Sequence, residues 1–242
     1  MSMNAGVLAP EISAVLHEHG GGEALWHALH DDPMTGLQIV SSEGVILYAN
    51  DSAARLFLGE GAAAAIYVGR SASEYYDPAT FAERVEYVAA VLRTGETRVL
   101  RSIFHGRQIV SRLSAVNVQR RDGPRERAVL VVSRPVEGDV SWLRRECPAY
   151  VDSRTISLGP LSSLSPRELQ VLALISQGKS MSDIARELRR SVHTVHDHRK
   201  SIGRKLGLDD RVQLATIARQ AGLRIEDAGL ARAEMAPIAG KH

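Results

Sequence analysis

Residues 191–207 read SVHTVHDHRKSIGRKLG and combine a cluster of histidines with a cluster of bases. Clustered histidines are typical of metal sites, whereas clustered bases are typical of surfaces that bind nucleic-acid phosphates. Ser191 is a favoured residue before a helix and Gly207 a favoured residue after one, so the stretch predicts a single helix. The directions in which its side chains point decide between the two interpretations.

A helical arrangement separates the three histidines. Successive residues of a helix turn by about 100°, which puts Val195, Ile202 and Leu206 on one apolar stripe. The opposite face is a continuous polar arc made of His193, His196, Asp197, Lys200 and Arg204. His198 flanks the apolar stripe instead. The three histidines therefore cannot bind one metal ion together, and no cysteine accompanies them, so we expect no metal site.

Start and stop signals predict that this helix is the third of four. Ser165 to Glu168 form a capping box with proline at the first helical position, and a second box begins at Ser180. Asp209 can cap a fourth helix that ends near Gly222. A short helix, a tight connection and a longer basic helix form a helix-turn-helix, whose second helix enters the major groove. The polar arc is therefore predicted to contact double-stranded DNA.

The sequence LSPRELQVLALISQGKSMSDIARELRRSVHTVHDHRKSIGRKLG, followed by RVQLATIA, is similar to the LuxR/NarL-type helix-turn-helix of bacterial transcription regulators. The resemblance covers residues 164–222 and implies a sequence-specific DNA-binding regulator. It implies base reading by His196, Asp197 and Lys200, and His193 joins them because it lies on the same arc. Contacts to the DNA backbone are implied for Thr194, Arg199, Arg204 and Lys205. The family commonly has other residues at His196 and Asp197, so the preferred DNA sequence is expected to differ.

The resemblance also implies that the fourth helix carries a dimer contact. A helical wheel gives this helix a second face of mostly small side chains, opposite its apolar face, made of Val212, Ala215, Thr216 and Arg219. An ordinary exposed helix is the alternative. We therefore expect a homodimer on double-stranded DNA, with RNA polymerase as a further candidate partner.

Charge divides the chain into two parts. The net charge of the 242 residues is +2, but residues 1–164 carry −3 and residues 165–242 carry +5. The basic part is thus expected to bind nucleic acid. The single cysteine, Cys147, cannot form an internal disulfide, no apolar run is long enough to span a bilayer, and the first residues lack the pattern of a secretory signal. We expect a cytoplasmic protein without a membrane segment.

Residues 35–136 predict an α+β domain. TGLQIV and VILYAN flank a glycine-containing turn, a short helix follows in DSAARLFLG, and residues 79–93 have helical spacing. Three strand candidates come next: TRVLRSIF, QIVSRLSAVNV and RAVLVVSR. This order resembles a PAS domain, and GVILYAN, DSAARLFLG and VGRSASEYYDP carry the resemblance. It implies a sensor domain built on a five-stranded antiparallel sheet.

The signal and any cofactor stay open at this stage. A candidate ligand pocket, which is equally well a closed core, would be lined by Leu47, Phe57, Phe81, Val85, Val99 and Ile103. The resemblance to flavin-binding and haem-binding PAS types fails, because the only thiol lies beyond the last strand and residues 79–93 contain no histidine. A small-molecule signal remains a candidate. The alternatives are an acyl-homoserine lactone in the N-terminal domain, or a PAS-like domain that serves only protein interaction and dimerisation. No catalytic constellation is present, so we do not expect an enzyme.

The expected fold is an α+β PAS-like domain with a five-stranded antiparallel sheet, followed by an all-α four-helix LuxR-type helix-turn-helix domain. The expected segments are an N-terminal helical segment, the sensor domain, a linker with a short signalling helix, the helix-turn-helix domain and a tail, at residues 1–34, 35–136, 137–160, 161–222 and 223–242. The signalling helix rests on the spacing of Val136, Val140, Leu143 and Cys147. The rest of the linker and the tail are expected to be irregular.

Overall fold

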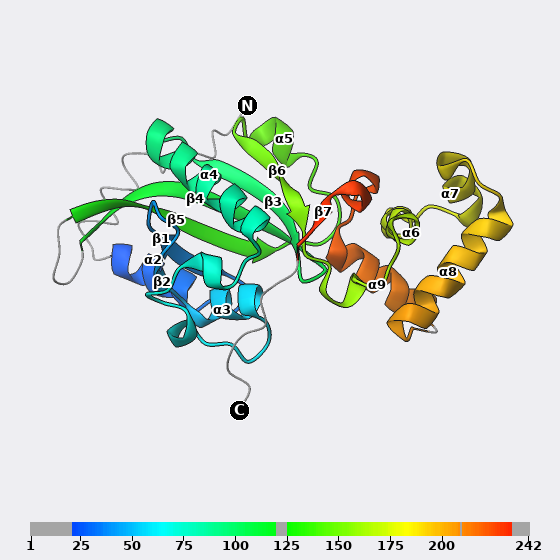
Figure 1. Cartoon of the computed structure of the whole chain (residues 1–242), viewed down its shortest axis with the longest axis horizontal. Helices are drawn as coiled ribbons and strands as arrows, with labels where there is room; N and C mark the ends of the chain where they lie inside the picture. The colour runs from blue at the N-terminus through cyan, green and yellow to red at the C-terminus, as the bar shows by residue number, and fades with distance from the viewer. Residues whose placement is uncertain (1–20, 120–124, 209, 234–242) are drawn as a thin grey trace.

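The computed structural model describes residues 21–119, 125–208 and 210–233. Figure 1 shows an elongated molecule with a sheet-containing domain at one end and a cluster of helices at the other. One sheet runs in the order β2-β1-β5-β4-β3-β6-β7. Its strands are β1 (Gly36–Val40), β2 (Ile46–Ala49), β3 (Arg98–Phe104), β4 (Arg107–Gln119), β5 (Arg125–Pro135), β6 (Tyr150–Ile156) and β7 (Ala231–Arg232).

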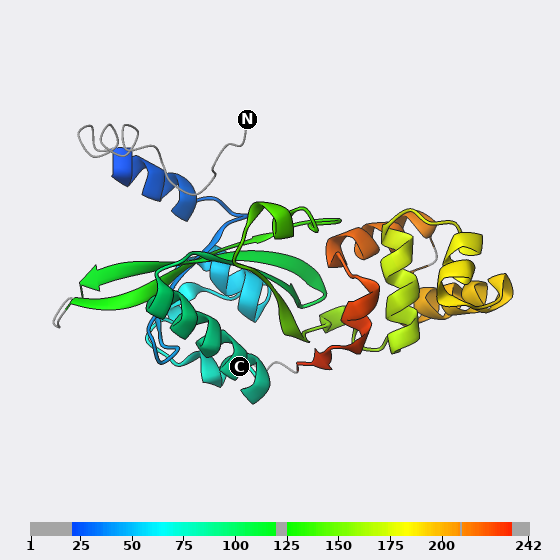
Figure 2. The same cartoon turned by 90° about the horizontal axis from the view of Figure 1, so that it is seen from above.

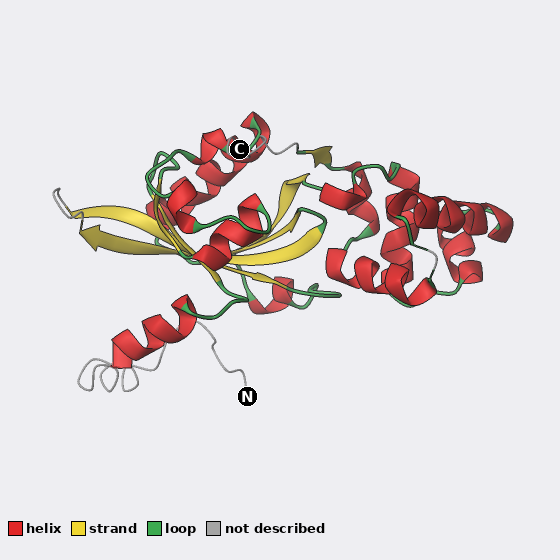
Figure 3. Ribbon diagram, turned by 90° about the horizontal axis from the view of Figure 1, so that it is seen from below, coloured by secondary structure: helices red, strands yellow, loops and turns green. Residues whose placement is uncertain are grey.

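The N-terminal domain surrounds the first five strands with helices. These are α2 (Gly21–His30), α3 (Asp51–Leu58), η1 (Ala64–Ile66), η2 (Ala72–Glu74), α4 (Pro78–Thr94) and, after β5, α5 (Leu143–Glu146). Asn50 caps α3, and Asp77 caps α4 ahead of a proline at its first position. Figures 2 and 3 show α2 extending away from the sheet, on the side opposite α4.

The helix-turn-helix domain has the four expected helices. They are α6 (Pro166–Ser176), α7 (Met181–Leu188), α8 (Val192–Leu206) and α9 (Arg211–Ala221), preceded by η3 (Gly159–Leu161) and followed by η4 (Ile225–Gly229). Ser165 forms the expected capping box with Glu168, and Ser180 and Ser191 cap α7 and α8. Asp210 caps α9. Asp209, the expected cap, lies outside the described residues. No helix in the described ranges is both long and apolar enough to cross a bilayer.

The expectation of five antiparallel strands was wrong for the sheet as a whole. The first five strands pair antiparallel in the expected way, but β6 and β7 add two parallel strands beyond β3. Both come from segments expected to be irregular, the linker and the tail. The register pairs Val99 with Tyr150 and Ile103 with Ile156. An uncovered β3 edge would leave a row of backbone N–H and C=O groups unpaired, and β6 pairs them.

The expected signalling helix is shorter than its spacing indicated. Only Leu143–Glu146 is helical, although Val140 and Leu143 are buried against Val99 in a small cluster. The helical spacing therefore reflects a shared apolar contact rather than one continuous helix.

Strand β3 separates two cores because its side chains alternate between the faces of the sheet. Leu100 and Phe104 point into the core formed with α3 and α4. Ile103 points the other way and belongs to the core of the helix-turn-helix domain, together with Ile156 of β6. The two domains thus share an apolar core through β3 and β6.

A buried arginine joins the domains beside this core. Arg101 lies between Leu100 and Ser102 on β3, and only 2% of its surface is exposed. Its Nη2 donates to Asp227 at 2.7 Å and to the backbone oxygen of Gly222 at 2.7 Å. Its Nη1 donates to Asp227 at 3.1 Å and its Nε to Gln108 at 2.6 Å. Gly222 ends α9, so the guanidinium also satisfies a carbonyl at the negative end of that helix.

Further contacts surround Arg101. Gln108 donates to the backbone oxygens of Val136 and Gly138, both at 2.9 Å. The N–H of Gly138 in turn donates to the backbone oxygen of Arg219 in α9 at 3.0 Å.

Asp152 of β6 accepts from Arg224 at 3.0 Å. Burial alone raises the pKa of Asp152, but the hydrogen bond from Tyr150 and the charge of Arg224 lower it overall.

A second ion pair, in which the carboxylate is buried and the lysine is exposed, fixes α8 on α6. Glu168 is almost fully buried and accepts from Nζ of Lys205, near the end of α8, at 2.6 Å and from the backbone N–H of Ser165 at 2.7 Å. Burial raises the pKa of Glu168, but the hydrogen bonds from Lys205 and Ser165 outweigh it and bring the pKa to about 2.

We predict that Arg101→Met lowers the free energy of unfolding by about 3–5 kcal/mol, because it leaves the Asp227 carboxylate buried without its partner. Urea unfolding measures the change. Arg107→Met at the exposed start of β4 is the control and should change stability by less than about 0.5 kcal/mol. The double variant Arg101→Met/Asp227→Leu should regain part of the loss, since it removes both charges of this pair. A double variant less stable than Arg101→Met would contradict this account.

We predict that Glu168→Gln costs about 1–3 kcal/mol of stability at pH 7 and much less near pH 2. The folded pKa lies below the ordinary value of 4.5, so the pair stabilises the fold above that value and loses its effect as the pH falls towards about 2. Unfolding of both proteins across this pH range measures the difference. Glu60→Gln, at an exposed position, is the control. A difference that stays constant down to pH 2 would show that packing, and not charge, is responsible.

Candidate nucleic-acid interface

The polar arc of α8 is directed to solvent. Val195 and Ile202 are fully buried against the rest of the domain. The side chains of the opposite face are exposed: His193, His196, Asp197, Lys200 and Arg204. Figures 1 and 2 show α8 at the end of the molecule away from the sheet, so the N-terminal domain does not cover the arc.

The histidines do not converge. Nε2 of His193 lies 3.5 Å from Oδ2 of Asp197, one turn further along α8. His198 is half-buried on the flank of the apolar stripe, as the helical wheel predicts. Within the described residues, no three histidine, cysteine or carboxylate side chains gather where they could hold a metal ion.

The residues implied as DNA-backbone contacts fall into two groups. Arg204 is exposed, and the hydroxyl of Thr194 lies 2.8 Å from that of Ser191 at the start of α8. Arg199 is half-buried, and Lys205 is engaged with Glu168. Lys205 therefore helps to hold α8 on α6, a role that the helical wheel did not predict.

Two further arginines lie beside the arc. Arg189 and Arg190 are exposed in the turn between α7 and α8, and Arg189 has a left-handed backbone with φ of 52°. Both add positive charge next to the N-terminus of α8. The helical wheel could not identify them because they belong to a turn, but the run of arginines before Ser191 was an available signal.

The expected dimer face of α9 is open at one end. Val212 is 69% exposed, whereas Ala215 and Thr216 are half-buried. Arg219 is exposed, but its backbone oxygen is held by Gly138 of the N-terminal domain. The N-terminal half of the face is thus free to meet another surface, and its C-terminal end abuts the N-terminal domain.

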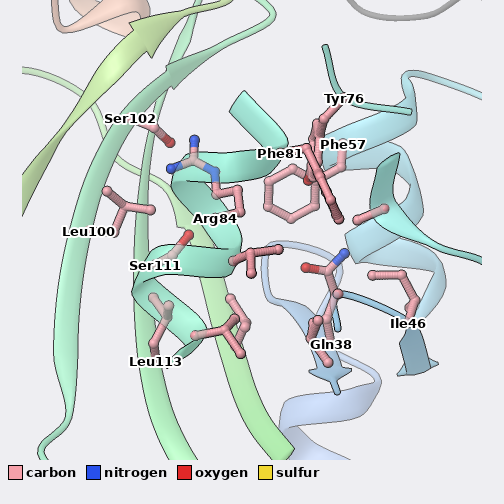
Figure 4. A pocket seen from close by; sticks show the side chains of 16 residues that line it. Gln38, Ile46, Phe57, Tyr76, Phe81, Arg84, Leu100, Ser102, Ser111 and Leu113 are labelled. Carbon is pink, nitrogen blue, oxygen red and sulfur yellow. The ribbon is translucent and has the colours of Figure 1, made fainter. Parts of the chain in front are cut away.

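The N-terminal domain contains a cavity between α4 and the sheet, and half of the expected pocket lines it. Phe57, Phe81 and Val85 contribute to the cavity wall (Figure 4). Leu47, Val99 and Ile103 do not. Val99 and Ile103 alternate with Leu100 and Ser102, which face the cavity, so they lie on the other face of β3. Hydrophobicity does not distinguish the two faces of a strand when both are buried.

The basic domain matches a known family. Residues 162–218 match the model of GerE, the bacterial regulatory proteins of the luxR family. The transcriptional regulatory protein LiaR of Bacillus subtilis (strain 168) is 42% identical over 59 residues, which are 24% of this chain and 28% of LiaR. This chain spans less than a third of the length of the curated relatives that it matches.

Two solved structures are similar over longer stretches. A complex of VqmA from Vibrio cholerae with ligand and DNA is 19% identical, with a TM-score of 0.45, and the match covers 88% of this chain and 94% of that one. The PAS domain of nitrogen regulation protein NR(II) from Vibrio parahaemolyticus is 22% identical, with a TM-score of 0.33, over 46% of this chain and 98% of that one. Residues 162–218 are thus similar to the regulatory domain of the luxR family, in the part of the chain that contains the helix-turn-helix.

Proposed function

We propose that this chain is a sequence-specific DNA-binding transcription regulator that acts as a homodimer and is controlled by a signal at its PAS-like domain. The observation that carries the proposal is the exposed arc of α8, on the second helix of a helix-turn-helix and clear of the sensor domain. That helix is the one that enters the major groove in this motif.

The chemistry of the arc suits base reading. Lys200 can donate to the O6 and N7 acceptors of guanine, and Asp197 can accept from N4 of cytosine. His193 and His196 extend the same surface with ring nitrogens. The phosphates would be contacted by Arg204, one turn beyond Lys200, and by Thr194 and Arg199. We add Arg189 and Arg190 to this group. Lys205 contributes less, since its ammonium is paired with Glu168.

The sensor domain is suited to control α9 through β3. Ser102 and Leu100 face the cavity, while Arg101 between them holds the C-terminal end of α9 and Asp227. A change at the cavity would therefore act on a strand that touches the DNA-binding domain directly. The cavity has about 60 Å³ of space open to water-sized atoms, which favours a compact ligand over the long chain of an acyl-homoserine lactone.

A role of the PAS-like domain in protein interaction alone is the second candidate. Leu25 and Trp26 are exposed on α2, which extends away from the sheet (Figure 2), and exposed apolar side chains on one helix suit a partner or a second copy. RNA polymerase is one candidate partner. Mass spectrometry of molecules released on denaturation of the purified protein distinguishes a ligand-binding sensor from an empty interaction module.

We predict that Lys200→Ala and Arg204→Ala weaken DNA binding in different ways. Lys200→Ala should cost about 1–3 kcal/mol on the preferred site and flatten the preference at one base position. Arg204→Ala should weaken binding to all sequences alike and lower the salt dependence by about one unit. Affinities for the preferred site and a random duplex, measured over a salt series, separate the two effects.

Glu60→Gln, far from α8 in the sequence and exposed, serves as the control and should bind as the parent protein does. Equal losses on both duplexes in Lys200→Ala would remove Lys200 from base reading. If the parent protein binds both duplexes equally well, sequence-specific regulation itself is excluded.

We predict that Ala215→Glu weakens binding to paired half-sites at least about tenfold and leaves single half-site binding intact. Two copies of the new carboxylate would face each other across a two-fold axis on α9, and repulsion would oppose pairing. Gel-shift titrations with one and two half-sites measure the effect. Gln213→Glu, at an exposed position of α9 outside the expected face, is the matched control. Equal loss on both DNAs would contradict a dimer contact at Ala215.

A further inference from the structure

The cavity of the PAS-like domain is small and mostly apolar, and one charged side chain forms part of its wall. Its walls include Val40 of β1, Val88 of α4 and Leu113 of β4. The space open to water-sized atoms is about 60 Å³, which corresponds to about four to six water-sized groups.

Arg84 of α4 is the cation of this cavity. Its side chain reaches toward the part of the sheet that carries Ser102, as Figure 4 shows. Its Nη1 is buried and has no hydrogen-bond partner within the described part of the chain. A buried donor without a partner destabilises the fold, and more so when it belongs to a charged group. The donor is therefore available to a ligand that can accept a hydrogen bond.

Glu83 forms an ion pair with Arg84 but does not accept a hydrogen bond from it. The Glu83 carboxylate lies 3.6 Å from Nη1, which is beyond hydrogen-bond distance. Its oxygens accept instead from the hydroxyls of Tyr87 and Ser153, each at 2.8 Å, and from the backbone N–H of Arg154 at 2.6 Å. Glu83 is thus committed to joining α4 to β6 and not to the cavity.

The other polar groups of the wall are neutral. Ser102 and Ser111 bring hydroxyls from β3 and β4, and Ser111 shares a hydrogen bond of 2.8 Å with Ser133. Burial raises the pKa of Tyr76 to about 12, so its hydroxyl carries no charge at neutral pH. No acidic side chain occurs among the described residues that line the cavity. The wall therefore combines one positive charge with apolar surface and hydroxyl groups.

We propose that this cavity binds a short-chain monocarboxylate of about two to four carbon atoms. The carboxylate accepts from Nη1 of Arg84, and the alkyl group packs on Val40, Val88 and Leu113. A charged acceptor gains more from an arginine N–H than a neutral one does, and a small apolar wall excludes longer or more polar ions. The inference rests on the proposed function, because it makes this ligand the signal of the sensor domain.

Propionate is the probe, and calorimetric titration of the full chain at pH 7 is the measurement. We expect saturable binding of sodium propionate at constant ionic strength, at least about tenfold tighter than binding of propionamide, which has nearly the same shape without the charge. Hexanoate should bind more weakly than propionate because the cavity cannot hold its chain. Arg84→Gln should weaken propionate binding at least about tenfold, while Arg93→Gln, the same change at an exposed position of α4, should leave it unaltered.

Three results would overturn the proposal: no saturable propionate binding, equal affinity for propionate and propionamide, or hexanoate binding as tightly as propionate. Unchanged binding in a folded Arg84→Gln variant, verified by circular dichroism, would do the same. If that variant does not fold, the comparison of the three compounds on the parent protein still decides. These titrations contain no DNA, and the DNA titrations contain no propionate, so failure of the ligand proposal and failure of the DNA-binding proposal are separate results.

Discussion

The burial of Arg101 is the constraint on which the arrangement of the two domains depends. A guanidinium removed from water must find hydrogen-bond acceptors for its donors and a nearby negative charge, or the fold pays several kcal/mol. Here the acceptors come from segments far apart in the sequence: Gln108 on β4, the end of α9 at Gly222, and Asp227 in η4. These segments can meet only if the chain after the helix-turn-helix returns to the sheet. The pairing of β7 with β6 completes that return.

Because Arg101 lies on β3, this strand contacts both the cavity of the N-terminal domain and the helix-turn-helix domain. Alternation puts Leu100 and Ser102 at the cavity and Arg101 and Ile103 at the helix-turn-helix domain. A shift of β3 along its length would displace both sets together, since a strand of seven residues moves as a unit when its backbone is hydrogen-bonded on both sides. Close-packed protein interiors absorb little of such a shift by themselves.

The elements that the sequence predicted well are those specified by neighbouring residues. Ser165, Ser180 and Ser191 each cap the helix that follows them, and the spacing of apolar residues in α8 predicted its buried stripe and its exposed arc. Strand β6 and the return of the tail could not be predicted in this way, because their stability comes from pairing with β3 and from Arg101. Those partners are distant in the sequence. Only half of the residues expected to line the cavity do so. Hydrophobicity marks β3 as buried but does not tell which of its two faces meets α4.

The position of α8 limits how a sensor of this design could work. The polar arc lies at the end of the molecule away from the sheet, so the docked N-terminal domain cannot act by covering it. The docked domain instead touches α9, through Arg101 at Gly222 and through Gly138 at Arg219. α9 also bears the exposed Val212 at the opposite end of the same helix. In the proposed homodimer, a change in the N-terminal domain would therefore act on the spacing of the two copies of α9, and with them of the two copies of α8. That spacing matters because the geometry of a dimeric helix-turn-helix sets the distance between the half-sites that it binds.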